Sequence, residues 1–144
     1  MELSSKRRTL ESLLTKNHIT LSNLSDLDQD MGNLLELKST ICYENCENIN
    51  LKINSKINRI IIIGCKNMCI QLAGVISGIE IKKSCGITIK IKKSFPLNSM
   101  FLENSKYITI SLSKKSYKEA FYDIAKSHGI IITDHQMNSL YLKN

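Results

Sequence analysis

The feature that most constrains this chain is an internal repeat between Ile41 and Asp134. Each of five segments places one small residue between two short runs of alternating apolar residues. The small residues are Cys46, Cys65, Ser84, Ser105 and Ser127, with spacings of 19, 19, 21 and 22 residues. A nearly constant period of about 20 residues is typical of a solenoid, in which one supersecondary unit stacks on the next.

The positions around each small residue repeat as well. Residues three and five places before it, and three and five places after it, are apolar or aromatic in all five segments. Alternation with period two places one set of side chains inside a strand and the other set outside. The residues two places after it are Asn48, Asn67, Gly86, Tyr107 and Gly129, of which four are Asn or Gly and tolerate a left-handed backbone. The sequence therefore predicts an all-β solenoid of about five coils with a tight corner at each small residue.

The remainder of the chain is expected to cover the ends of this solenoid. Leucines at helical spacing predict a short amphipathic helix over roughly residues 5–16, within an N-terminal helix and capping segment of residues 1–40. A brief strand is expected at Ile19 and Leu21, followed by an acidic loop, SDLDQDMGN. Residues 41–144 form the β-helix domain with a C-terminal tail, in which the last coil carries a polar loop, SKKSYKEAFYDIAKS. The segment LYL near the C-terminus is expected to add a final strand.

Composition limits the kinds of partner. The 144 residues are 42% hydrophobic and 23% charged, as in an ordinary globular domain. No apolar run reaches the length of a membrane span, and MELSSKRR lacks a signal peptide's apolar stretch, so we expect a cytoplasmic protein without membrane contact. The net charge is +7 and comes mainly from lysine. Because few arginines and few interleaved aromatic residues accompany it, an acidic protein partner is favoured over nucleic acid.

Catalytic and metal-binding motifs receive little support. Cys42, Cys46, Cys65 and Cys69 have a spacing that zinc sites use. However, strand alternation places Cys46 and Cys65 inside and Cys42 and Cys69 outside, so four thiolates would not converge. The three histidines have no nucleophile motif beside them, although His128 follows Ser127, and no glycine-rich phosphate loop follows a strand. We therefore expect no enzyme activity, no cofactor and no metal.

The outward positions carry many basic residues. A tentative docking face consists of Lys52, Lys56, Arg59, Lys82, Lys90 and Lys92. Outward lysines along several coils would suit an acidic partner. The same lysines are equally well explained by the need of a β-surface for charge that keeps it soluble and discourages edge pairing.

The run from STICYENCENINLKI to KKSCGITIKI resembles the C-terminal CARP-repeat domain of cyclase-associated proteins. The residues that match are Tyr43, Cys46, Asn48, Ile49, Lys56, Ile57, Asn58, Cys65 and Lys66, and the resemblance extends over roughly residues 40–134. It implies a right-handed parallel β-helix that binds monomeric actin, prefers ADP-actin and promotes nucleotide exchange, so that actin subunits are recycled near the cytoskeleton. A chain this short is similar to the stand-alone forms of apicomplexan parasites.

Alternatives remain open on the same residues. The family's domain usually continues with a P-E-Q-type segment and a strand pair exchanged between two subunits. Here ten residues follow Asp134, so a homodimer through C-terminal strands would need LYL to supply a shortened version. The β-helix of tubulin-binding cofactor C, which acts on tubulin or small GTPases, is also similar, but KKSFPLNSMF lacks that family's arginine. A non-catalytic interaction scaffold is the third alternative.

Overall fold

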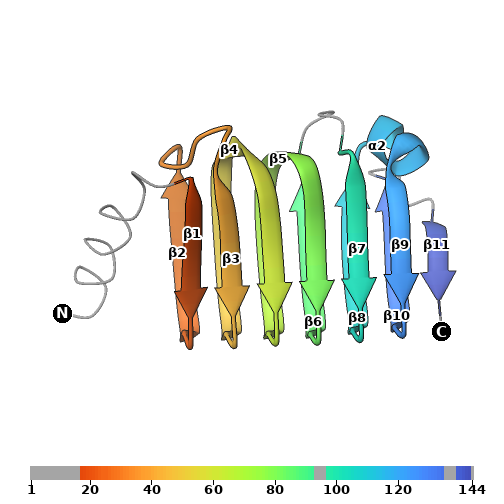
Figure 1. Ribbon diagram of the computed structural model, residues 1–144, viewed down its shortest axis with the longest axis horizontal. Coiled ribbons are helices and arrows are strands. Elements are labelled where there is room, and N and C mark those ends of the chain that lie inside the picture. The colour runs from red at the N-terminus through yellow and green to blue at the C-terminus, as the bar shows by residue number, and fades with distance from the viewer. Residues whose placement is uncertain (1–16, 93–96, 135–138, 144) are drawn as a thin grey trace.

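The computed structural model describes residues 17–92, 97–134 and 139–143, which form a stack of parallel strands (Figure 1). The strands are β1 (His18–Ser22), β2 (Ser25–Gly32), β3 (Thr40–Glu44), β4 (Glu47–Ile63), β5 (Lys66–Lys82), β6 (Cys85–Ile91), β7 (Ser99–Glu103), β8 (Lys106–Leu112), β9 (Phe121–Ala125), β10 (His128–Asp134) and β11 (Ser139–Lys143). One short helix, α2 (Lys114–Glu119), precedes β9. The β-solenoid predicted from the repeat, and the parallel β-helix implied by the family resemblance, are confirmed.

The strands form two layers that lie one in front of the other in Figure 1. Layer A contains β1, β3, residues 59–63 of β4, residues 78–82 of β5, β7 and β9, each paired in parallel with the next. Layer B contains β2, residues 47–53 of β4, residues 66–72 of β5, β6, β8 and β10, also parallel. Tight corners join A to B at the bottom of the view, and longer turns return from B to A at the top.

Every tight corner has the same backbone conformation. Two residues with positive φ flank each corner at a spacing of three, as Asn45 and Asn48 do with φ of 54° and 56°. The predicted left-handed position is confirmed in all five repeats, including Tyr107 with φ of 55°. Tyr107 lies beside Gly129 of the next coil, where an added Cβ would be 2.8 Å from the tyrosine Cδ1. The glycine thus leaves room for the aromatic ring.

A ladder of hydrogen bonds connects the small corner residues from coil to coil. The Oγ atoms of Ser84, Ser105 and Ser127 accept from the backbone N–H groups of Cys65, Ser84 and Ser105 at 3.1, 3.3 and 3.1 Å. The thiol of Cys65 donates to the carbonyl oxygens of Tyr43 and Ile63 at 3.4 and 3.5 Å. These residues must be small because they face inward at a corner and because they pair with buried backbone groups.

The core between the layers consists of the predicted inward positions. Eighteen of the twenty are buried, while Tyr122 and Ile124 in the last coil of layer A are only partly buried. The fully buried hydroxyl of Tyr43 donates to Gln29 Oε1 at 2.6 Å. Gln29 lies opposite Leu51 in register, so its amide occupies a position that is apolar in the next coil. This amide provides the hydrogen-bond partner that the buried Tyr43 hydroxyl needs.

Two sequence predictions are corrected. The acidic segment expected as a loop is strand β2, in which Leu27 and Met31 are buried and the aspartates face outward. With β1 it adds a coil before the five predicted repeats, and Asn23 and Asp26 supply the positive-φ corner. The polar loop expected in the last coil contains α2, whose N-cap Ser113 accepts from Ser116 N at 3.2 Å.

The C-terminal strand is confirmed. β11 pairs antiparallel with β10 of the same chain, Leu142 opposite Ile131 and Lys143 opposite Ile130. The helix predicted over residues 5–16 lies outside the described residues.

Candidate functional site

The outward surfaces of the two layers are the candidate site, and they divide the predicted basic residues. Lys52 and Lys90 lie on layer B, and Lys92 directly follows β6 in that layer. Arg59 and Lys82 lie on layer A. Lys56 lies on the long-turn side of β4, opposite Gly74 of β5. These residues therefore lie on more than one surface, because the outward side chains of the two layers point in opposite directions.

The face of layer B presents columns of polar residues. Lys52, Gln71 and Lys90 are neighbours in register on three successive strands. At the start of the same layer, Asn50 Nδ2 donates to Asp28 Oδ1 at 2.9 Å. A second column joins three coils: Asn67 Nδ2 donates to Asn48 Oδ1 at 2.6 Å, and Asn48 Nδ2 donates to Asp26 Oδ1 at 2.8 Å. These amide ladders join neighbouring coils, and beside them Lys90 is exposed while Lys52, opposite Asp30 in register, is partly exposed.

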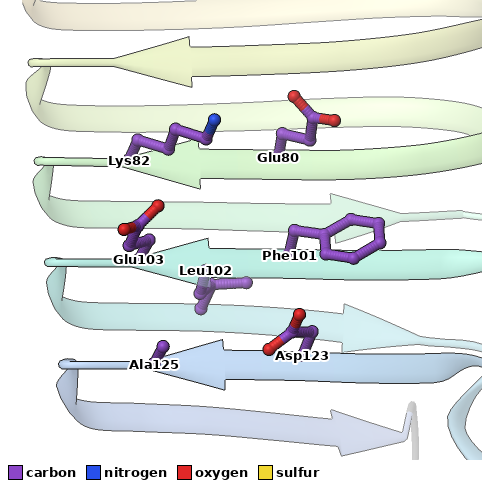
Figure 2. Close-up of a pocket in the computed structure, with 7 residues that line it drawn as sticks. All are labelled: Glu80, Lys82, Phe101, Leu102, Glu103, Asp123 and Ala125. Carbon is purple, nitrogen blue, oxygen red and sulfur yellow. The ribbon is translucent and has the colours of Figure 1, made fainter.

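The face of layer A is acidic and aromatic towards its C-terminal end. Glu80, Lys82, Phe101, Glu103, Asp123 and Ala125 line a hollow of about 370 Å³, with Leu102 at its base (Figure 2). The Arg59 guanidinium forms a salt bridge with Glu80 at 3.3 Å. No local motif in the sequence groups these carboxylates. The repeat contains the signal, since Glu80, Phe101 and Asp123 each precede the small corner residue by four places.

Two thiols, those of Cys42 and Cys65, have raised pKa values. Burial, and secondly the Glu44 carboxylate, raises the pKa of Cys42 to about 11. Burial also raises the pKa of Cys65 to about 11. Both shifts favour the protonated thiol, which is a poor nucleophile. Cys46 and Cys65 are buried, and Cys69 is partly exposed, as strand alternation predicts; Cys42 faces outward but is covered by its neighbours.

Two further features bear on the kind of site. Among residues 17–92, 97–134 and 139–143, no three His, Cys, Asp or Glu side chains are grouped so as to hold a metal ion. In the same part of the chain, no helix has both the length and the apolar character of a membrane span.

These features define a parallel β-helix whose two outward faces are open to partners. The chain belongs to the family described as adenylate cyclase associated (CAP) C terminal, whose model matches residues 14–139. The cyclase-associated protein from Cryptosporidium parvum has a similar solved structure, with a TM-score of 0.62, 23% identity, and coverage of 88% of this chain and 69% of that chain. No curated protein sequence matches this chain. The family expected from the sequence is confirmed.

Proposed function

We propose that this protein binds monomeric actin, prefers the ADP-bound form and promotes exchange of actin's nucleotide. The observation that carries the proposal is the family match over residues 14–139. Such a protein needs no covalent chemistry, because it changes actin by binding one nucleotide state better than the other. The protonated thiols are consistent with this mode of action. The protein would act in the cytoplasm, close to the cytoskeleton.

The lysines of layer B are the proposed contact with actin. The chain carries a net charge of +7, and actin is an acidic protein, so complementary charge would accelerate their encounter. Lys52 and Lys90 lie in one column of layer B and Lys92 follows it. On layer A, by contrast, Arg59 is already paired with Glu80. Layer B therefore has the basic residues best placed to meet an acidic surface.

The test is binding to purified actin monomers, loaded with ADP or with ATP, followed by release of a fluorescent nucleotide. We expect tighter binding to ADP-actin and faster nucleotide release. A chain that binds neither form at micromolar concentration contradicts the proposed function.

A pair of double variants tests the docking face. Lys52→Glu with Lys90→Glu should weaken actin binding on the order of tenfold, mostly through slower association that depends on salt. Arg59→Glu with Lys82→Glu is the matched change on layer A, and its thermal melting must be checked because it removes the salt bridge to Glu80. A folded layer A variant that loses as much affinity as the layer B variant contradicts the layer B assignment.

The homodimer is a separate proposal. β11 pairs with β10 of its own chain here, and exchange between two chains would use the same strand register. Sedimentation of the full chain, compared with a variant in which Leu142 is replaced by proline, tests whether these strands join two subunits.

A further inference from the structure

Three strands of layer A place an aromatic ring between two carboxylates. Phe101 on β7 is opposite Glu80 of β5 on one side and opposite Asp123 of β9 on the other. Neighbouring strands in a sheet are about 4.8 Å apart, so both carboxylates lie beside the ring. Figure 2 shows the three side chains projecting from the same face while Leu102 points to the other side.

The next residues on the same face enlarge this site. Lys82, Glu103 and Ala125 form a second row in register, and the small side chain of Ala125 leaves the row open at β9. Phe121 is 61% exposed, and its ring lies 6.1 Å from the Phe101 ring, centroid to centroid, with an angle of 54° between the ring planes. Glu80, Phe101, Glu103, Phe121 and Asp123 together are called the acidic-aromatic patch.

The charge of the patch is opposite to that of the whole chain. The chain has a net charge of +7, yet three carboxylates gather around two phenylalanines in the patch, with Lys82 nearby. Within the described residues, the carboxylates of Glu103 and Asp123 have neither a hydrogen-bond partner nor a salt-bridge partner, whereas Glu80 is bonded to Arg59. An exposed ring, Phe121, next to a partly exposed one, Phe101, with unpaired carboxylates beside them, has unused capacity for a cation.

We propose that the acidic-aromatic patch binds an arginine side chain in a basic segment of a partner protein. The guanidinium stacks on the Phe101 ring and donates hydrogen bonds to Asp123, and the apolar residue next to the arginine packs on Phe121. The hollow of about 370 Å³ between the two rows receives the side chain. This site lies on layer A and does not depend on the proposed contact of layer B with actin.

The geometry favours arginine over other ligands. Guanidinium is planar, so one face stacks on a ring while its edge donates to a carboxylate. The lysine ammonium is a compact, strongly hydrated charge without a face to stack. Phosphate groups of nucleic acid or lipid would be repelled by the three carboxylates.

The experiment is a titration of the isotope-labelled full chain with a capped peptide, GSRLRSG, followed by NMR at low salt. We expect shifts centred on residues 80, 101, 103 and 123, and a several-fold loss of affinity when the salt concentration is raised tenfold. A matched peptide with citrulline in place of arginine has the same shape without the charge and should not bind.

Variants of the patch decide the role of each group. Asp123→Asn should weaken binding about three- to tenfold, because the charged carboxylate acceptor is replaced by a neutral amide oxygen. Phe101→Leu keeps apolar bulk but removes the ring, and it should weaken binding by about two- to thirtyfold. Gln71→Ala on layer B is the control and should change nothing. Unchanged affinity in Phe101→Leu, or equal binding of the citrulline peptide, overturns the proposal.

The same variants separate this inference from the proposed function. Asp123→Asn and Phe101→Leu should leave actin affinity unchanged if layer B is the actin contact. A chain that binds the peptide but not actin supports the patch and contradicts the proposed function, and the reverse result contradicts the patch alone.

Discussion

The tight corners and the long turns on the opposite side of the solenoid differ in how strictly their sequence is constrained. Each tight corner has two positive-φ residues around one inward residue, and in the five predicted repeats that inward residue is a cysteine or serine. The long turns differ from coil to coil: β4 and β5 continue through theirs with register shifts, and the last coil contains α2. The repeats are 19 to 22 residues long, and the long turns accommodate these differences in length. One edge fixes the register, and the other accommodates extra residues.

The largest effect should come from changing the length of a corner. Inserting Gly-Ser between Cys65 and Lys66 separates the two positive-φ positions, Gly64 and Asn67, and should cost more than about 4 kcal/mol or prevent folding. The same insertion after Asn54, where the β4–β5 register is already shifted, should cost about 1 kcal/mol. Urea denaturation measures both, and similar losses would contradict the comparison.

A bulky corner residue should have the next largest effect. Ser105→Val adds volume at a fully buried position and leaves Ser84 N–H without its acceptor, so we expect a loss of about 2–5 kcal/mol in unfolding free energy. Ser77→Val on the long side removes a partly exposed hydroxyl that donates to Asn58 and should cost about 1 kcal/mol.

Ser105→Cys is the control for this prediction, because cysteine occupies the same column at Cys46 and Cys65. It should cost about 1 kcal/mol, since a thiol is a weaker hydrogen-bonding group than a hydroxyl. A loss as large as that of Ser105→Val would show that the hydroxyl, and not size, determines the column.

A smaller gain is expected where a corner carries a strained residue. Lys83 has φ of 51°, a conformation that costs an L-residue about 1–2 kcal/mol, so Lys83→Gly should stabilise the fold by about 0.5–1 kcal/mol after the entropy of glycine is subtracted. Lys90→Gly, in an ordinary strand position, should instead destabilise by about 0.5–1 kcal/mol. Thermal melting of the two variants distinguishes the effects, and a shift of the same sign in both would contradict the corner strain.

The smallest effect at neutral pH concerns the protonation of the corner thiol, which changes stability only in alkaline solution. The pKa of Cys65 rises from 9.0 to about 11 in the folded chain, so its proton is held more tightly in the folded state. The stability from this thiol is complete below pH 9 and is lost as the pH rises from about 9 to about 11. Cys65→Ser should therefore lose less stability than the wild type across that interval in denaturation curves. Parallel curves for the two proteins would contradict it.

The sequence predicts the corners well because each coil places one small inward residue between two positions of positive φ, so three positions per coil are constrained together. Alternation likewise identifies inward positions such as Ile70 and Ile89. Alternation does not distinguish layer A from layer B. From the sequence alone Lys52 and Lys82 are both simply outward, whereas in the structure they lie on different layers. The first coil was missed because Leu24 replaces the small corner residue and aspartates occupy the outward positions of β2.

The candidate docking surfaces depend on register across coils. Glu80, Phe101 and Asp123 are far apart in the sequence and become neighbours only when the repeats are aligned on Ser84, Ser105 and Ser127. The helix α2 had a local signal, an N-cap serine at Ser113, which the polar composition of the segment obscured.

The reversed direction of β11 has a consequence for head-to-tail association of copies of this chain. A solenoid whose two ends both present parallel edges can add another molecule head to tail, and such contacts generate open fibres because the symmetry does not close. At the C-terminal end of layer B, an incoming β2 would meet β11, which runs opposite to β10. The parallel hydrogen-bond pattern cannot continue across that strand. A second molecule that joined layer B at this end would have to pair antiparallel with β11, so the reversed strand interrupts the parallel repeat from which such a fibre would be built.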